Sequence, residues 1–292
     1  MSTDEIRPVA IVMEPVEAQE AKGVLIRRTI GSERLVLLDP LLLLDHLQVS
    51  PSDGGTSVGF PRHPHRGIET LTYVLSGRVH HRDSLGNDSS VGTNGSQWMT
   101  AGGGIFHEEM LEFGGGERVA VEALQLWFNL PADRKMTPPG YAAATETEIP
   151  AVALPDGGTV RVIAGQAFEA VGPFSGIAVS PTVLDVSLPS GASVTLPAPA
   201  LRTTVAYLYQ GTATFGEGAG ERTATAARLV IFADGSSVRV TTADSPARFL
   251  MVSAPPLREP VLQYRSLVMN TVEQMRDALD DLERGTFAMP GK

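Results

Sequence analysis

The stretch HPHRGIETLTYVLSG, residues 63–77, contains two patterns on which the interpretation of the whole chain depends. Its second half, residues 70–77, is rich in β-branched and aromatic residues and ends at a glycine, which is typical of a β-strand followed by a turn. Its first half holds two histidines separated by one residue. Because alternate residues of a strand point to the same face, His63 and His65 are expected to face the same way.

A sequence related to this strand occurs later in the chain, at a shift of 134 residues. Residues 204–211, TVAYLYQG, resemble residues 70–77, TLTYVLSG. At the same shift Pro197 and Pro199 replace the two histidines, and Thr203 replaces Glu69. The repeat predicts two domains built on one scaffold, of which only the first has kept the histidines.

The remaining strand-like runs predict an all-β fold. Short apolar, β-branched runs recur between turns rich in glycine and proline, for example at residues 24–30, 119–130, 183–188 and 247–252. Such short strands at turn-limited spacing are typical of antiparallel sandwiches and barrels. A polar N-terminal segment, residues 1–20, is expected to be a loosely attached arm. We expect domains at residues 1–143 and 144–256, joined near the PPG sequence at 138–140.

One α-helix is predicted, at residues 271–284. Thr271 and Gln274 have the spacing of a capping box, and Gly285 stands where a helix is expected to stop. Apolar residues in between form a single stripe, so the helix is expected to pack on a barrel. Residues 257–292 are therefore predicted to form a C-terminal connector and helix that pack on the barrels.

The composition bounds the class of protein. A chain of 292 residues is long enough for two domains, each with its own core. Its net charge of −10, without a run of Lys or Arg, disfavours direct nucleic-acid binding. The lack of cysteine excludes disulfides and thiolate ligands. The acidic N-terminus does not resemble a signal peptide, and the most apolar segment, residues 35–44, is too short to span a bilayer, so we expect a cytoplasmic protein that binds no membrane.

A second histidine cluster follows the glycines of GGGIFHEE, residues 102–109. His107 and Glu109 are expected to share one face of a strand, while Glu108 points to the other. Three neutral imidazoles and one carboxylate would suit a divalent first-row metal, so the sequence predicts one site for Fe(II), Mn, Ni, Co, Cu or Zn. No histidine follows His107, which confines this site to the first domain.

Alternative interpretations exist for several of these residues. A His-x-His pair alone is more often a surface or hydrogen-bonded pair, and the second cluster is what favours a metal. Glu69 has the same parity as His63 and His65, and the spacing does not choose between it and Glu109 as the fourth ligand. Other candidates are expected to have structural roles: His46 in the core or at its edge, and His80 and His81 at the surface or behind the ligands. Phe60, Trp98 and Phe106 are expected in the core, with the mouth of a cavity as the alternative for each.

Several segments together resemble the pirin family, a branch of the cupin superfamily. They are IRRTIG at 26–31, FPRHPHRGIET at 60–70, QWMTAG at 97–102, GIFHEEM at 104–110 and PLREP at 256–260, and they extend over nearly the whole chain. The resemblance implies a bicupin with two stacked antiparallel β-barrels of the cupin type and a short C-terminal α-helix. It also implies iron as the usual metal and a set of four ligands, which favours Glu109 over Glu69: His63, His65, His107 and Glu109.

The resemblance implies two classes of function. Some pirins are similar to quercetin 2,3-dioxygenases, which open a flavonol ring with O₂ and release carbon monoxide. In such an enzyme Glu109 would be a ligand and also the catalytic base for the flavonol hydroxyl. Other members are iron-dependent, redox-sensitive regulators that bind a transcription factor or a metabolic enzyme. We expect a metal-dependent dioxygenase with a flavonol-like substrate, with a protein-binding regulator as the alternative and a purely structural metal as a third hypothesis.

Overall fold

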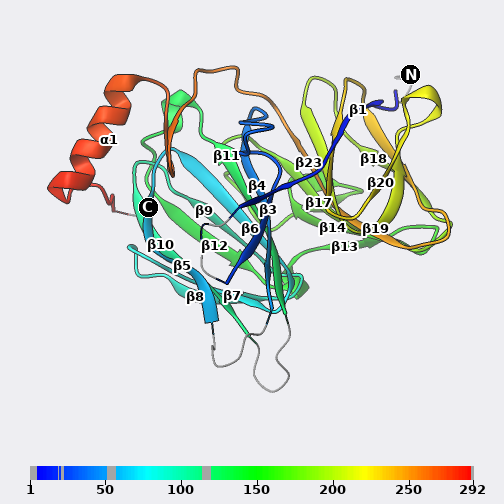
Figure 1. The fold of residues 1–292 in the computed structure, drawn as a ribbon, viewed down its shortest axis with the longest axis horizontal. Helices are drawn as coiled ribbons and strands as arrows, with labels where there is room; N and C mark the ends of the chain where they lie inside the picture. Colours follow the sequence, from blue (N-terminus) through cyan, green and yellow to red (C-terminus); the bar gives the residue numbers. More distant parts are fainter. Residues whose placement is uncertain (1–4, 19, 21–22, 51–56, 114–119, 291–292) are drawn as a thin grey trace. The chain divides into compact units, whose positions relative to one another are not determined.

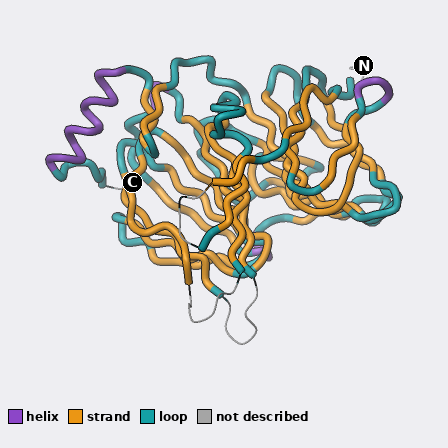
Figure 2. Tube along the Cα trace, in the orientation of Figure 1, coloured by secondary structure: helices purple, strands orange, loops and turns teal. Residues whose placement is uncertain are grey.

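The computed structural model describes residues 5–18, 20, 23–50, 57–113 and 120–290. They fold into β-strands with one α-helix, as the sequence predicts (Figures 1 and 2). The chain divides into two compact units. The N-terminal barrel comprises Val16–Thr147 and Leu257–Lys292, and the C-terminal barrel comprises Met1–Pro15 and Glu148–Pro256.

Two antiparallel sheets form the N-terminal barrel. One has the strand order β12 (Gly140–Ala144), β9 (Ser96–Thr100), β6 (Ile68–Ser76), β11 (Val121–Asn129), β4 (Leu41–Val49), β3 (Leu25–Arg28) and β2 (Val16–Ala18). The other has the order β5 (Ser57–His65), β10 (Ile105–Glu112), β7 (Arg78–Asp83) and β8 (Asp88–Gly92). Apolar side chains from both sheets meet in one core, including those of Ile26, Leu47, Val74, Val79 and Leu111.

The C-terminal barrel is also built from antiparallel strands. Its main path runs β1 (Val9–Met13), β21 (Arg228–Phe232), β19 (Thr203–Phe215), β23 (Ala247–Ala254), β17 (Thr182–Leu188), β14 (Thr159–Ala164) and β13 (Ala151–Ala153). Beside it lie β18 (Ser193–Pro197), β22 (Ser237–Thr241) and β20 (Arg222–Thr225). The C-terminal barrel also contains the short strands β15 (Gln166–Ala167) and β16 (Ala170–Val171) and the short helix η3 (Gly218–Gly220). Two further short helices are η1 (Ala132–Arg134), in the N-terminal barrel, and η2 (Glu146–Glu148), at the boundary between the two units.

The two strand orders correspond position by position, which confirms the predicted repeat. The middle strand β6 lies between β9 and β11, and its counterpart β19 lies between β21 and β23. Gly77 ends β6 with a φ of 79°, and Gly211 has a φ of 80° at the equivalent point of β19. The turn after β6 becomes a bend within one continuous strand in the C-terminal barrel, because β19 runs on to pair with β20 and β22.

The first strand of the chain belongs to the C-terminal barrel, which differs from the expected boundaries at 1–143 and 144–256. β1 pairs antiparallel with β21, in the position that β12 occupies in the N-terminal barrel. The buried Arg7 fastens this segment by donating hydrogen bonds to the carbonyl oxygens of Ala198, Pro199 and Ala233. An edge strand has unpaired backbone groups, and the N-terminal segment satisfies them instead of forming a loose arm.

The C-terminal segment forms a hairpin and the predicted helix. The hairpin is β24 (Leu262–Tyr264) and β25 (Leu267–Met269), and the helix is α1 (Val272–Arg284), shown in red in Figure 1. The capping box of Thr271 and Gln274 is present, and Gly285 ends the helix with a φ of 72°. These observations confirm the predicted helix. Its buried face packs on the hairpin of the same unit, in a cluster of Leu267, Met269, Met275, Ala278 and Phe287.

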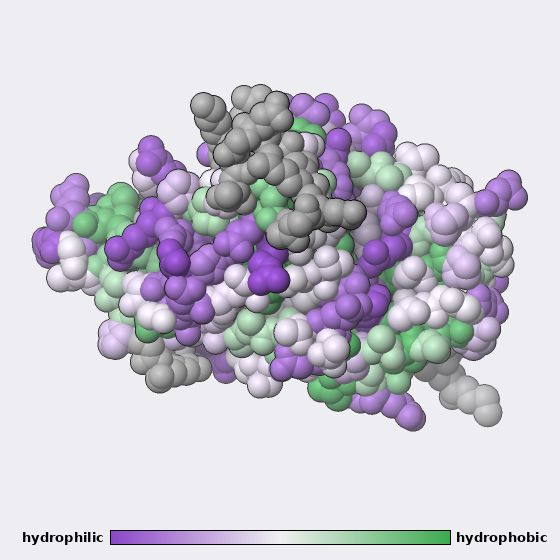
Figure 3. Space-filling view, turned by 90° about the horizontal axis from the view of Figure 1, so that it is seen from below, coloured by the Kyte–Doolittle hydropathy of each residue, from purple (hydrophilic) through white to green (hydrophobic). Residues whose placement is uncertain are grey.

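The surface mixes polar and apolar residues. Figure 3 shows one face, on which hydrophilic side chains in purple lie between hydrophobic ones in green. Within the part of the chain that the structure describes, no helix has both the length and the apolar character needed to cross a membrane.

Candidate metal centre

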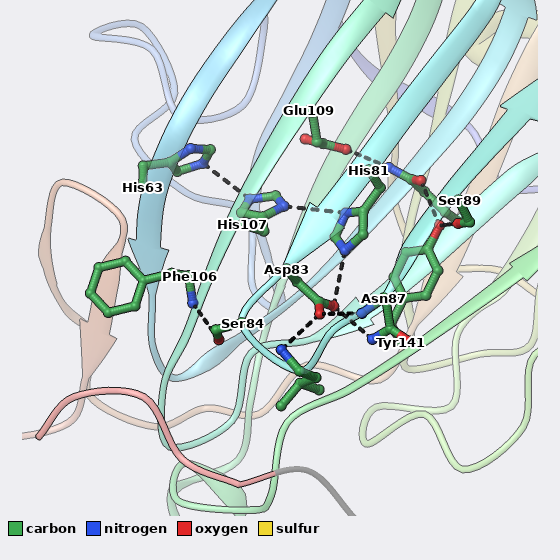
Figure 4. Close-up of polar contacts among 12 residues, drawn as sticks. His63, His81, Asp83, Ser84, Asn87, Ser89, Phe106, His107, Glu109 and Tyr141 are labelled. Atoms are coloured by element: carbon green, nitrogen blue, oxygen red, sulfur yellow. Dashed lines mark hydrogen bonds and ion pairs between the residues drawn. The ribbon is translucent and has the colours of Figure 1, made fainter.

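Three histidines from two neighbouring strands converge in the N-terminal barrel. His63 and His65 lie at the end of β5, and His107 lies near the start of β10 (Figure 4). The Nε2 atom of His63 is 3.0 Å from Nε2 of His65 and 3.0 Å from Nε2 of His107. Nitrogen ligands about 2.1 Å from one metal ion would be separated by about this much, so the three lone pairs can meet at one cation.

An irregular register between β5 and β10 places these side chains. His107 pairs with His63 while Glu109 pairs with Phe60, so β5 has one more residue than β10 between these two pairs. A β-bulge of this kind reverses the alternation of side chains along one strand. Phe60 packs against the barrel core although its parity is opposite to that of His63 and His65, and all three line one cavity. The bulge thus brings both histidines to the inside.

Glu109 lies beside the histidines on the buried face of β10. Its Oε1 atom accepts hydrogen bonds from Gln97 Nε2 (2.5 Å) and Thr72 Oγ1 (3.0 Å), and its Oε2 atom accepts one from Gln125 Nε2 (2.5 Å). It lines the same cavity as His63 and His65, and its ligand atom lies within 4.8 Å of those of His81 and His107. The two amides hold the carboxylate in one orientation.

The competing carboxylate, Glu69, has a different environment. It is buried in β6 and accepts a hydrogen bond from Thr100 Oγ1 at 2.8 Å. It does not line the cavity, and it belongs neither to the group of His63, His65 and His107 nor to that of His81, His107 and Glu109. Strand parity alone did not choose between Glu69 and Glu109 as the fourth ligand. In the folded barrel Glu109 is the carboxylate nearer to the histidines.

Burial keeps two of the three imidazoles neutral. His65 and His107 are only 1% and 2% exposed. Desolvation, and after it the neighbouring histidines, lower the pKa of both side chains well below the usual value. Neutral imidazoles offer the lone pairs that a metal needs. The Nδ1 atom of His65 is buried without a hydrogen-bond partner among the described residues, and that of His63 lies 2.8 Å from the carbonyl oxygen of Pro61. The residues therefore fit a bound divalent cation.

A second layer of polar residues lies behind His107 (Figure 4). His81 Nδ1 is 3.5 Å from His107 Nδ1, and His81 Nε2 is 3.1 Å from Asp83 Oδ2. The ring of Tyr141 stacks on His81 with a centroid distance of 4.1 Å. The hydroxyl of Tyr141 also donates to Gln97 Oε1 at 2.9 Å, and burial raises its pKa to about 12, so it remains protonated at neutral pH.

A cavity of about 530 Å³ opens beside the cluster. Its apolar wall includes Leu42, Leu43, Phe60 and Trp127, and the Trp127 ring meets His65 edge to face at 5.0 Å. Its polar lining includes the Arg28–Asp45 ion pair and, from the β24–β25 hairpin, residues Gln263, Arg265 and Ser266. Ligand sites for small molecules combine apolar walls and a few placed polar groups in this way.

Comparison with known proteins agrees with this arrangement. The Pirin family model matches residues 23–128, and the model described as the Pirin C-terminal cupin domain matches residues 183–288. The chain belongs to the pirin family. A pirin-like protein from Caulobacter vibrioides is 37% identical over 97% of this chain and 99% of its own length.

Solved structures of similar fold include a pirin and a dioxygenase. A quercetin 2,3-dioxygenase from Acinetobacter baumannii matches with a TM-score of 0.86 and 31% identity, over 97% of this chain and 98% of that one. A bacterial pirin from Escherichia coli, crystallised in complex with nickel(II), matches with a TM-score of 0.65 and 20% identity, over 84% of this chain and all of that one. The predicted all-β fold of two cupin domains with a C-terminal helix is thus confirmed.

Not all residues around the pirin-type cluster could be recognised in the sequence. His63, His65 and His107 converge as expected. Phe60 lines the cavity, which is the alternative to a core position that the sequence left open for it. Gln97 and Gln125, which hold Glu109, were not singled out, and His81 was left between two interpretations. The signal was present for Gln97, which lies in the QWMTAG segment, but a glutamine in a strand has no distinctive spacing. His46 is buried in β4, with its Nε2 atom 3.9 Å from Glu122 Oε2.

Proposed function

We propose that this protein is a metal-dependent dioxygenase of the quercetin 2,3-dioxygenase type, which opens a flavonol ring with O₂ and releases carbon monoxide. The observation that carries the proposal is the cavity of about 530 Å³, which is lined by His63, His65 and Glu109 together. Its volume lies within the range of about 300–1,000 Å³ that is typical of small-molecule sites. The similarity over 97% of the chain to a quercetin 2,3-dioxygenase supports the same reaction.

The proposed ligands of one divalent metal ion are His63, His65, His107 and Glu109. When bound, the metal would supply Lewis-acid chemistry for the flavonol 3-hydroxyl oxygen. Iron(II) is the metal that the family resemblance implies, and the nickel(II) complex of the similar bacterial pirin adds nickel to the ions that deserve testing. Each of these side chains offers a nitrogen or oxygen donor that first-row divalent ions accept.

The chain's own residues would bind and orient the substrate. Trp127 and Phe60 offer aromatic faces to a planar ring system in the cavity, and Leu42 and Leu43 exclude water from the same wall. Glu109, held by Gln97 and Gln125, is the candidate base for the 3-hydroxyl proton. A regulator that acts only through its outer surface would need the metal but not this lined cavity, which is why the enzyme is preferred over the protein-binding alternative.

Aerobic quercetin consumption and carbon monoxide release test the proposal. Protein loaded separately with iron, manganese, nickel, cobalt or copper is expected to consume the flavonol with at least one of them. Glu109→Gln keeps the size of the side chain and removes its charge, so turnover should fall by about 10²–10⁴-fold. Glu69→Gln is the matched control and should retain activity. Absence of turnover with every metal, in protein whose metal content has been measured, would refute the enzyme.

A further inference from the structure

The three clustered histidines differ in the groups that their Nδ1 atoms face, on the side of each ring away from the converging Nε2 atoms. Nδ1 of His63 faces a backbone carbonyl, and Nδ1 of His65 has no hydrogen-bond partner among the described residues. Nδ1 of His107 instead faces another histidine, His81, which in turn faces Asp83. Figure 4 shows this row from His63 through His107 and His81 to Asp83. His107 is therefore the ligand candidate whose orientation depends on other side chains.

The carboxylate of Asp83, at the end of the row, is fixed as a hydrogen-bond acceptor. Its Oδ1 atom accepts from the backbone N–H groups of Leu85 (2.9 Å) and Asn87 (3.1 Å), and its Oδ2 atom accepts from Asn87 Nδ2 (2.8 Å). The side chain of Asp83 is fully buried. Since a carboxylate surrounded by donors only accepts, the Nε2 atom of His81 must carry a proton to complete the contact at 3.1 Å.

This proton determines the protonation of the next ring. A neutral His81 with its proton on Nε2 has a lone pair on Nδ1, directed at His107. His107 can direct a lone pair from Nε2 toward His63 only if its own proton is on Nδ1, directed at His81. The separation of 3.5 Å is at the long end of the hydrogen-bond range, so the contact orients the ring rather than adding much free energy.

Tyr141 connects the same ring to the other ligand candidate of β10. Its ring stacks on His81 with an interplanar angle of 14°, and its hydroxyl donates to Gln97, whose amide donates to Glu109. The orientation of His81 is thus fixed from two sides, by Asp83 in its plane and by Tyr141 across its face.

We propose that His81 and Asp83 are positioning residues, which hold His107 in the tautomer that presents its Nε2 lone pair to the metal. The inference rests on the metal site of the proposed function but not on the reaction. A metal-bound histidine commonly donates its other N–H to an acceptor, which fixes the ring and increases its basicity. Here the acceptor is a second histidine, itself set by a carboxylate held in the turn between β7 and β8.

Three substitutions separate this role from a merely structural one. His81→Phe keeps a ring against Tyr141 but removes the acceptor. Asp83→Asn can present an N–H to His81, which would move the His81 proton to Nδ1 and set two donors against each other. His81→Asn retains an oxygen acceptor close to the position of Nδ1. The first two are expected to bind metal more weakly, and the third is expected to recover most of the affinity.

The measurement is nickel(II) affinity of metal-free protein by titration calorimetry, with the visible absorption of the cobalt(II)-loaded protein as a second readout. We expect nickel affinity to fall about 10–100-fold in His81→Phe and Asp83→Asn, with a shifted cobalt absorption band. His80→Phe is the control, because His80 is adjacent on β7 but pairs with Asp88 and Glu112. It should leave both readouts unchanged. Melting of the metal-free variants establishes that each is folded.

Wild-type affinity and an unchanged cobalt spectrum in both His81→Phe and Asp83→Asn would overturn the proposal. Equal losses in His81→Asn and His81→Phe would also overturn it, as would a wild-type protein that binds neither ion. If His81→Phe fails to fold, the comparison of Asp83→Asn with His81→Asn decides in the same way. These binding measurements are made anaerobically and without flavonol, so they do not depend on the reaction. A protein that binds nickel as expected but never consumes quercetin would therefore refute the proposed function alone.

Discussion

The strand that precedes the middle strand in the chain, β5 in the N-terminal barrel and β18 in the C-terminal barrel, is paired differently in the two barrels. In the N-terminal barrel β5 pairs with β10 through a bulge, and His63 and His65 line the cavity. In the C-terminal barrel β18 pairs with β22 in a regular register from Ser193 to Pro197. Pro197 and Pro199 there are exposed, and the buried residues are their neighbours Leu196 and Ala198.

This difference shows that the C-terminal barrel lacks more than the ligand residues. Leu196 and Ala198 belong to a continuous apolar core, together with Val238 and Val240 of β22. With the regular register, the positions aligned with the histidines face outward. We infer that the proposed metal site needs both the histidines and the bulge that turns them inward.

Loss of one clustered histidine should have the largest effect. His107→Ala removes a nitrogen donor and should reduce nickel affinity by more than the about 10–100-fold expected for residues that only support a ligand. Metal content after dialysis and titration calorimetry measure this, with His80→Ala as the control. Full metal content in His107→Ala would mean that the three histidines do not form the site.

Transplanting the two histidines into the C-terminal barrel should not create a second metal site. In Pro197→His with Pro199→His the new rings would lie on the exposed face of the C-terminal barrel, so tight metal binding should not increase. Metal analysis after dialysis against a weak chelator is expected to give the same number of ions per chain as in the wild type. An additional tightly held ion in the double variant would show that the bulge is not required.

A third prediction concerns the C-terminal segment, whose strand β25 lies against the end of the histidine strand β5. Gly67 has a φ of 78°, and a Cβ atom on it would lie 1.8 Å from the carbonyl oxygen of Val268. Gly86 has a φ of 89° but open space around its Cβ position. Gly86→Ala should cost about 1–2 kcal/mol of unfolding free energy from backbone strain. Gly67→Ala should cost roughly 1–3 kcal/mol more from the collision with β25.

Urea unfolding of both variants at one pH measures this difference. Metal affinity of Gly67→Ala should fall as well, because Arg66 and Val268 join β5 to β25 through a backbone hydrogen bond of 3.0 Å next to His65. Equal destabilisation in the two variants would show that the contact with Val268 relaxes without cost.

A last prediction concerns the pH dependence of the stability of the metal-free protein. Because burial lowers the pKa of His65 and His107 in the folded state, the unfolded chain binds more protons below its histidine pKa of about 6.5. Unfolding free energy should therefore fall as the pH drops through 6.5, by up to about 1.4 kcal/mol per pH unit for each group. Urea midpoints at pH 7.5 and 5.5 measure this change, and replacing His65 by Phe should reduce it. An unchanged midpoint would contradict neutral buried imidazoles.

Features that depend on neighbouring residues could be predicted from the sequence alone. Thr271, Gln274 and Gly285 define the helix because capping is local. Residues 70–77 and 204–211 predict matching strands because strand residues alternate and end at glycine. The concentration of all histidines before residue 108 confines the proposed metal site to one barrel, since histidine is the nitrogen ligand available to a chain without cysteine.

Features that depend on pairing between distant strands became visible only in the folded chain. The two residues between Phe60 and His63 oppose a single residue on β10, and this register, which no local pattern encodes, turns the histidines inward. Pairing likewise brought Gln97 and Gln125 to Glu109, and His81 to His107. The strand β1 joined the C-terminal barrel because an edge of β21 was open to it. Long-range hydrogen bonds and burial, rather than sequence spacing, fixed each of these contacts.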